Sequence, residues 1–167
     1  MPLARRPVDP TEFPDMVVIY LGMRVNSISG IKTVIGIGPK ISRSVAARPD
    51  GLLLHEPLLF SLFPLHIGMR QYWKDFESLE AWARSDPHRG WWNQFLRNTG
   101  GTGIWHETYF MRGGMEALYG NMVEETGFLR FAHVAEAKGP MFSARGRLRH
   151  LREPAKPELT SEEEFEK

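Results

Sequence analysis

The order of strand-like and helix-like segments is the feature of this sequence that most limits its possible folds. Four segments are rich in β-branched and aromatic residues and are bounded by turn residues; they cover residues 16–25, 52–60, 65–73 and 103–112. Helical spacing of apolar residues occurs at 31–48, after the first segment, and at 75–85 and 86–98, after the third. The order βαββαβ predicts an α+β protomer with an antiparallel sheet and the ferredoxin-like split βαβ plan.

This plan also predicts the position of each strand in the sheet. The first and third strands are central, the fourth lies beside the first, and the second lies at the opposite edge. Pro57 lies in the second strand and cannot donate to a ladder, which independently favours an edge position. Pro39 predicts that the first helix is broken or kinked, and Asp75 and Asp86 are candidate N-caps, with Pro87 in the following first turn.

Composition predicts one soluble domain with extensions at both ends. Residues 1–15 hold four prolines and predict a flexible arm, residues 16–134 the domain, and residues 135–167 an extension with a mobile charged tail. The chain has no cysteine, which excludes disulfides and thiolate chemistry. The net charge of +1 and the lack of a long apolar run give no indication of nucleic-acid or membrane binding, so we expect a cytoplasmic protein.

The fourth strand carries the most unusual residues. Side chains alternate along a strand, so His106 faces one side of the sheet while Trp105 and Glu107 face the other. His106 could accept a proton from an acidic phenol or enol, and the resulting carbanion could pass an electron to dioxygen. In the alternative interpretation His106 is a structural histidine. Glu107 then pairs with an arginine of a neighbouring strand, such as Arg24 or Arg70.

The helix before this strand offers a second group of candidates. Trp91 and Trp92 are adjacent and cannot share one helical stripe, so one should face the core and the other a pocket or an interface. Asn93 could donate a hydrogen bond to a substrate carbonyl. The alternative is aromatic core packing with Asn93 on the surface.

Three stretches of the sequence resemble a known family. They are the segment from Gln71 to Trp82 together with His88, the segment from Gly103 to Tyr109, and the segment from Tyr119 to Met122. They are similar to the antibiotic-biosynthesis-monooxygenase group of dimeric α+β barrels, and more narrowly to a branch grouped with a monooxygenase of fungal fumagillin clusters. The resemblance covers about residues 16–134. It implies a homodimer, with a pocket between the sheet and the helices of each protomer. Some members of the group oxidise phenols or polyketides with dioxygen and no cofactor.

The combined expectation is a monooxygenase-like oxidoreductase that acts on a hydrophobic aromatic, polyketide-like or terpenoid-like molecule with dioxygen and no bound cofactor. His106 would accept the proton, and Asn93 or Arg24 would stabilise the anion. The expected substrate contacts are Tyr20, Trp92, Trp105, Glu107 and Tyr109.

Two alternatives stay open. Related barrels hold haem, and the candidate iron ligands would be His66, His106 or His133. The protein could also be a non-enzymatic dimer that binds apolar ligands. A tight zinc site is not expected, because the histidines form no HExxH motif or close pair.

Overall fold

The computed structural model describes residues 4–111, 114–122 and 125–152. Contacts within the chain define two compact units. Of the described residues, 13–111 form the sheet unit, and 4–12, 114–122 and 125–152 form the small unit. No helix in the described ranges is long and apolar enough to cross a membrane.

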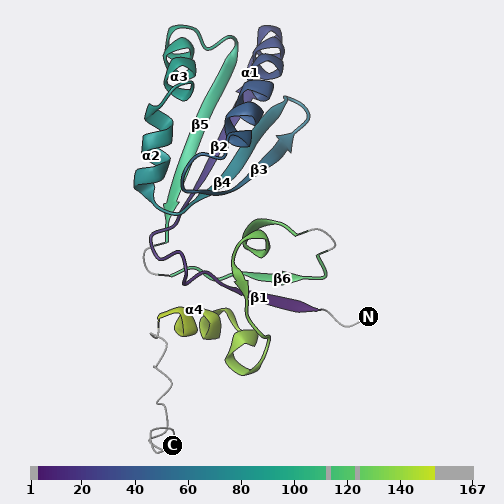
Figure 1. Ribbon diagram of the computed structural model, residues 1–167. Coiled ribbons are helices and arrows are strands. Elements are labelled where there is room, and N and C mark those ends of the chain that lie inside the picture. Colours follow the sequence, from purple (N-terminus) through teal and green to yellow (C-terminus); the bar gives the residue numbers. More distant parts are fainter. Residues whose placement is uncertain (1–3, 112–113, 123–124, 153–167) are drawn as a thin grey trace, which may run out of the picture. The chain divides into compact units, whose positions relative to one another are not determined.

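The sheet unit contains the four predicted strands in the predicted order. They are β2 (Val17–Val25), β3 (Leu52–Ser61), β4 (His66–Trp73) and β5 (Thr102–Phe110). All neighbours are antiparallel and the order is β3-β4-β2-β5, so β2 and β4 are central (Figure 1). The strand that contains Pro57 is an edge strand, as its missing N–H favours. Its two register shifts lie elsewhere, between Leu52 and Leu54 and between Leu59 and Ser61. The ferredoxin-like fold class is therefore confirmed.

Three helices accompany this sheet: α1 (Ile28–Ala46), α2 (Phe76–Arg84) and α3 (His88–Arg97). Asp75 caps α2 as predicted, because its side chain accepts a hydrogen bond of 2.7 Å from the backbone N–H of Ser78. Val17, Trp73 and Leu79 form the buried core where α2 packs on β2 and β4. Helix α3 begins at His88, so Pro87 precedes the first turn instead of entering it.

Helix α1 corrects one prediction. The sequence predicted a helix that is broken or kinked at Pro39, and the break is not found, because α1 continues through this residue. A proline inside a helix removes one hydrogen bond and crowds the residue before it. That residue is Gly38, which has no Cβ to meet the proline ring, and this helps the helix to continue.

The small unit corrects the predicted arm and tail. Residues expected to be a flexible arm form β1 (Arg5–Asp9), which pairs with β6 (Leu118–Gly120) and β7 (His133–Val134). Two 3₁₀ turns, Gly127–Arg130 and Gly139–Phe142, and helix α4 (Ala144–Arg152) complete the unit (Figure 1). The predicted boundary after residue 134 thus separates segments that belong to one unit. Residues 153–167, also predicted to be mobile, lie outside the described residues.

A buried arginine explains why the basic run at 145–152 is ordered at its start. Arg147 is 5% exposed; its Nε donates to Glu116 at 2.6 Å and its Nη1 donates to the carbonyl of Met141 at 2.8 Å. A buried guanidinium has to be paired in this way, because its transfer from water is otherwise very costly. Arg147 therefore fixes α4 to the segment around Glu116.

Candidate functional site

Pairing between strands shows which residues share each face of the sheet. His106 of β5 pairs with Leu21 of β2, whereas Trp105 pairs with Gly22 and Glu107 with Tyr20. The side chains of Leu21 and His106 therefore lie on one face, and those of Trp105, Glu107 and Tyr20 lie on the other. This alternation is the one predicted from the sequence.

A cavity of about 320 Å³ lies between the helices and the Leu21 face of the sheet. Its volume is near the lower end of the range for small-molecule pockets. The lining residues come from six elements of the sheet unit, three strands and three helices. They are Leu21, Gly22 and Met23 of β2; Ile67 and Met69 of β4; Ile104 of β5; Lys32, Thr33, Gly36, Ile37, Gly38, Lys40 and Ile41 of α1; Trp82 of α2; and His88, Trp91, Trp92, Gln94 and Phe95 of α3, with Asn98 at its end.

Aromatic rings form the α2–α3 side of this cavity. The centroid of the His88 ring lies 4.7 Å from that of Trp82 and 6.2 Å from that of Trp91. Trp92 stacks on Phe95 with centroids 5.9 Å apart. Both Trp91 and Trp92 line the cavity, although the sequence predicted only one of them in a pocket. The remaining wall is mostly aliphatic, so the cavity suits a flat, hydrophobic ligand.

His88 is the histidine of the cavity, and the sequence did not single it out as a site residue. Its Nδ1 lies 2.9 Å from the carbonyl oxygen of Ala83. A carbonyl oxygen only accepts hydrogen bonds, so Nδ1 carries a proton and Nε2 of the neutral ring carries the lone pair. His88 begins α3, one turn before Trp91, and this spacing was the available sequence signal.

The charged groups of the cavity are all basic. Lys32 and Lys40 of α1 are in the lining, and no described lining residue is a carboxylate. An anion formed inside would therefore be favoured by these two positive charges. The described residues also contain no cluster of histidine and acidic side chains suited to a metal ion.

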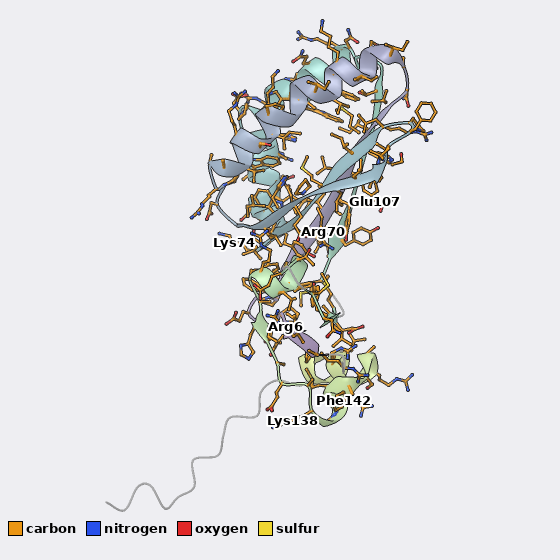
Figure 2. All side chains as sticks on the ribbon, turned by 90° about the vertical axis from the view of Figure 1, so that its right-hand side faces the viewer. Arg6, Arg70, Lys74, Glu107, Lys138 and Phe142 are labelled. Carbon is orange, nitrogen blue, oxygen red and sulfur yellow. The ribbon has the colours of Figure 1, made fainter. Side chains whose placement is uncertain are left out.

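The opposite face of the sheet carries a separate polar network. Arg70 donates to Glu56 through Nη2 at 2.5 Å and through Nε at 3.0 Å, and Nη1 donates to the hydroxyl of Tyr20 at 3.3 Å. Burial alone would lower the pKa of Arg70, but the hydrogen bonds to Tyr20 and Glu56 outweigh it and raise that pKa. Figure 2 shows Arg70 and Glu107 on the sheet. The alternative pairing of Glu107 with Arg70 is not formed, because Arg70 binds Glu56.

Glu107 instead accepts a hydrogen bond from the hydroxyl of Tyr109 at 2.5 Å. This bond and the charge of Glu107 raise the pKa of the Tyr109 hydroxyl, although Tyr109 is exposed. Nearby, the indole Nε1 of Trp105 donates to Nε2 of His66 at 2.8 Å. The Trp105 ring lies across Gly22, where a Cβ would be 2.6 Å from Nε1.

The predicted site residues are therefore divided between several places. Trp92 lines the cavity. His106 is on the cavity face but is exposed on edge strand β5 and outside the lining, and Asn93 is exposed on α3, also outside it. The other predicted residues, all on the opposite face, are Tyr20, Arg24, Trp105, Glu107 and Tyr109. The predicted base and the predicted substrate contacts are thus not brought together around the cavity.

The three histidines proposed for haem also lie outside the cavity. His66 accepts from Trp105 on the opposite face, His106 is on the edge strand, and His133 belongs to the small unit. A haem ligand must present a ring nitrogen to the iron inside the pocket. These residues do not fit a haem bound in the cavity.

Comparison with known proteins identifies one family. The family described as "Monooxygenase af470-like" matches residues 16–128. A search of curated proteins finds no match.

Solved structures share the fold at low sequence identity. An aldoxime dehydratase is 20% identical with a TM-score of 0.62, and the match covers 88% of this chain and 43% of that one. The aldoxime dehydratase OxdRE, in complex with butyraldoxime, is 21% identical with a TM-score of 0.54, covering 77% and 37%. The chain thus spans less than half the length of these two enzymes. SnoaB, a cofactor-independent oxygenase from Streptomyces nogalater, is 14% identical with a TM-score of 0.45, covering 59% and 94%.

Proposed function

Because the chain belongs to the Monooxygenase af470-like family, we propose that it is a monooxygenase-like oxidoreductase that binds a hydrophobic small molecule in the sheet–helix cavity. The observation that carries the proposal is the cavity itself, which is enclosed by aliphatic side chains and three tryptophans. The substrate class is aromatic, polyketide-like or terpenoid-like, since a flat apolar molecule matches this lining.

The proposed reaction uses dioxygen and needs no other reductant. One oxygen atom forms a carbonyl with a CH₂ carbon of the substrate. The second oxygen atom leaves as water with the two hydrogens of that carbon. The substrate loses four electrons and dioxygen gains four, so electrons and atoms balance. Loss of a proton from a phenol or enol makes the substrate electron-rich, which allows it to reduce dioxygen directly without a bound cofactor.

Oxygen consumption tests this proposal. The purified full chain is mixed with a panel of hydrophobic phenols and enolisable ketones in an oxygen electrode, without added metal or cofactor. We expect one dioxygen consumed for each substrate molecule oxidised, and ¹⁸O₂ should place one labelled atom in the product. Binding of the panel members without any oxygen uptake would contradict the enzyme and support a ligand-binding protein.

Haem is the alternative cofactor, and its test is independent. The cofactor-free proposal predicts no Soret band shift when haem is added to the purified chain. The three histidines predicted as iron ligands lie outside the cavity, and His88, which does line it, is the residue to substitute if a shift is seen. A shifted Soret band that is competed by a cavity ligand would replace the cofactor-free proposal with a haem enzyme.

A homodimer is part of the same proposal. Exposed apolar groups on the opposite sheet face, including Phe60 at 44% and Tyr109 at 50%, support it. Sedimentation equilibrium of the full chain measures the mass directly, and a monomer at all concentrations would remove this part of the proposal.

A further inference from the structure

We propose that His88 is the proton acceptor of the cavity, and that its ligand is a weak acid of the phenol or enol class. This inference rests on the proposed function, since it assigns a role inside the same cavity. It replaces His106, the acceptor expected from the sequence, with the histidine that lines the cavity.

The hydrogen bond to Ala83 prepares His88 for this role. A histidine that donates from Nδ1 to a backbone carbonyl keeps its lone pair on Nε2, and a general base needs that lone pair. No described side chain or backbone group forms a hydrogen bond with Nε2, and no buried, unpaired side-chain polar atom is found. Nε2 is therefore accessible and available to a ligand hydroxyl.

The aromatic neighbours fix the plane of the ring. Trp82 lies at 45° to the His88 ring, and Trp91 at 61°. Together with the Nδ1 hydrogen bond they restrict rotation of the imidazole, which a positioned base requires. The same tryptophans line the cavity together with His88, so a flat ligand beside them would lie next to the imidazole ring.

The charges around His88 favour the anion that proton transfer creates. Lys32 and Lys40 of α1 are the other titratable residues of the lining. Asp86, two residues before His88, is held by Arg89 at 2.8 Å, so its charge is compensated. The O–H bond of the ligand breaks, its proton moves to Nε2, and the electron pair stays on the ligand oxygen. For a phenol, Nε2 later returns this proton to the ligand oxygen. For an enol, whose O–H hydrogen came from the CH₂ carbon, it passes the proton to the oxygen atom that leaves as water.

An ionisable probe tests the assignment without knowledge of the natural substrate. 4-Nitrophenol absorbs at different wavelengths as phenol and phenolate, and 4-nitroanisole has the same shape without the acidic hydrogen. We expect both to bind the full chain. At a fixed pH, His88→Gln should lower the phenolate-to-phenol ratio of bound 4-nitrophenol about tenfold, as a charge neighbour shifts a pKa by about one unit. The affinity for 4-nitroanisole should fall by less than this factor, because that probe has no acidic hydrogen for Nε2 to accept.

His106→Gln is the matched control, because it removes a histidine from the same sheet face but outside the lining. An unchanged ratio in His88→Gln, or a loss in His106→Gln instead, would overturn the assignment while leaving the cavity proposal standing. Failure of 4-nitroanisole to bind would contradict the proposed function and, with it, this inference.

A second measurement needs no variant. Long-range ¹H–¹⁵N correlation of the wild-type chain reports which ring nitrogen of each neutral histidine carries the proton. We expect the Nδ1–H tautomer for His88. Observation of the Nε2–H tautomer would overturn the proposal even if His88→Gln fails to fold.

Discussion

At the residue scale, Asp75 shows how one side chain determines where a helix begins. Its carboxylate accepts hydrogen bonds from Ser78, and these lower the pKa of Asp75 below its ordinary value of 3.8. The unfolded chain therefore binds the proton more readily than the folded chain does. The carboxylate contributes stability above pH 3.8, and this contribution falls away as the pH drops through the lower, folded value.

We expect Asp75→Ala to reduce the free energy of unfolding by about 1 kcal/mol at neutral pH, because α2 loses its N-cap. Urea unfolding at several pH values measures the difference. It should shrink as the pH falls through the lower pKa of the folded chain, where the wild-type carboxyl becomes protonated. Asp75→Asn keeps a capping oxygen and should lose much less at neutral pH; an equal loss in both variants would contradict the capping explanation.

His88 and His106 show which part of the site the sequence could and could not predict. Alternation along β5 is a local property, so the division of His106 and Trp105 between two faces was predictable and is confirmed. The position of His88 depends on how α3 follows α2 and on where the carbonyl group of Ala83 lies. The three-residue spacing to Trp91 places both side chains on one stripe of α3, but the contact with Ala83 is tertiary geometry that this spacing does not contain.

At the element scale, α1 forms one wall of the cavity with unusually small residues. Gly36 lies on the same stripe as Lys32 and Lys40, which are four residues away on either side and also line the cavity. A Cβ placed on Gly36 meets no atom within 4 Å. Helices normally avoid glycine, because it costs about 1 kcal/mol relative to alanine. Gly36 lines the cavity, so a larger side chain there would occupy space that the proposed ligand would use.

Gly36→Leu should therefore fill that space and stabilise the helix. We expect affinity for 4-nitroanisole to fall at least about tenfold, while the free energy of unfolding rises by up to about 1 kcal/mol. Fluorescence titration and thermal unfolding provide the two readouts.

Gly90→Leu is the control for this variant. Gly90 is in α3, has the same open surroundings and does not line the cavity, so it should gain stability and keep its affinity. Equal affinity in both variants would show that the ligand binds elsewhere.

The sheet itself was predictable from the elements. The apolar β2 had to be central and the strand with Pro57 had to be an edge, and both positions are found. The continuous helix α1 was not predicted, because the effect of Pro39 depends on the glycine before it. Helix α3 begins at His88, one residue later than the sequence predicted.

At the scale of the whole molecule, the chain consists of two units, and the sequence pattern predicts one of them much more strongly than the other. The sheet unit has strong periodicity. The small unit has short strands, and β1 pairs with residues more than a hundred positions later. Such long-range pairing leaves little trace in local sequence, so the arm and the start of the tail were wrongly predicted to be unstructured.

Arg147 is the residue on which we expect the order of the small unit to depend. Arg147→Met removes one member of a largely buried ion pair and leaves Glu116 without its partner. The loss should approach about 3 kcal/mol within this unit, the lower end of the range for a broken buried pair. Hydrogen exchange with mass spectrometry should show faster exchange in residues 114–152.

The sheet unit supplies the internal control for that experiment. Its exchange and its affinity for 4-nitroanisole should stay unchanged, because Glu116 and Arg147 both belong to the small unit. Loss of protection in the strands of the sheet unit would show that the two units unfold together.

The bond between His88 and Ala83 has a consequence for how this site could change during evolution. Its acceptor is a main-chain carbonyl, which every amino acid provides. A substitution at position 83 would therefore remove the bond only if it distorted the backbone. An insertion or deletion between residues 83 and 88 would remove this hydrogen bond, because it would move the His88 ring away from the carbonyl. Which ring nitrogen of His88 carries the proton therefore depends on the length of the segment between residues 83 and 88. Substitutions in this segment should preserve the tautomer, whereas a change in the number of its residues should not.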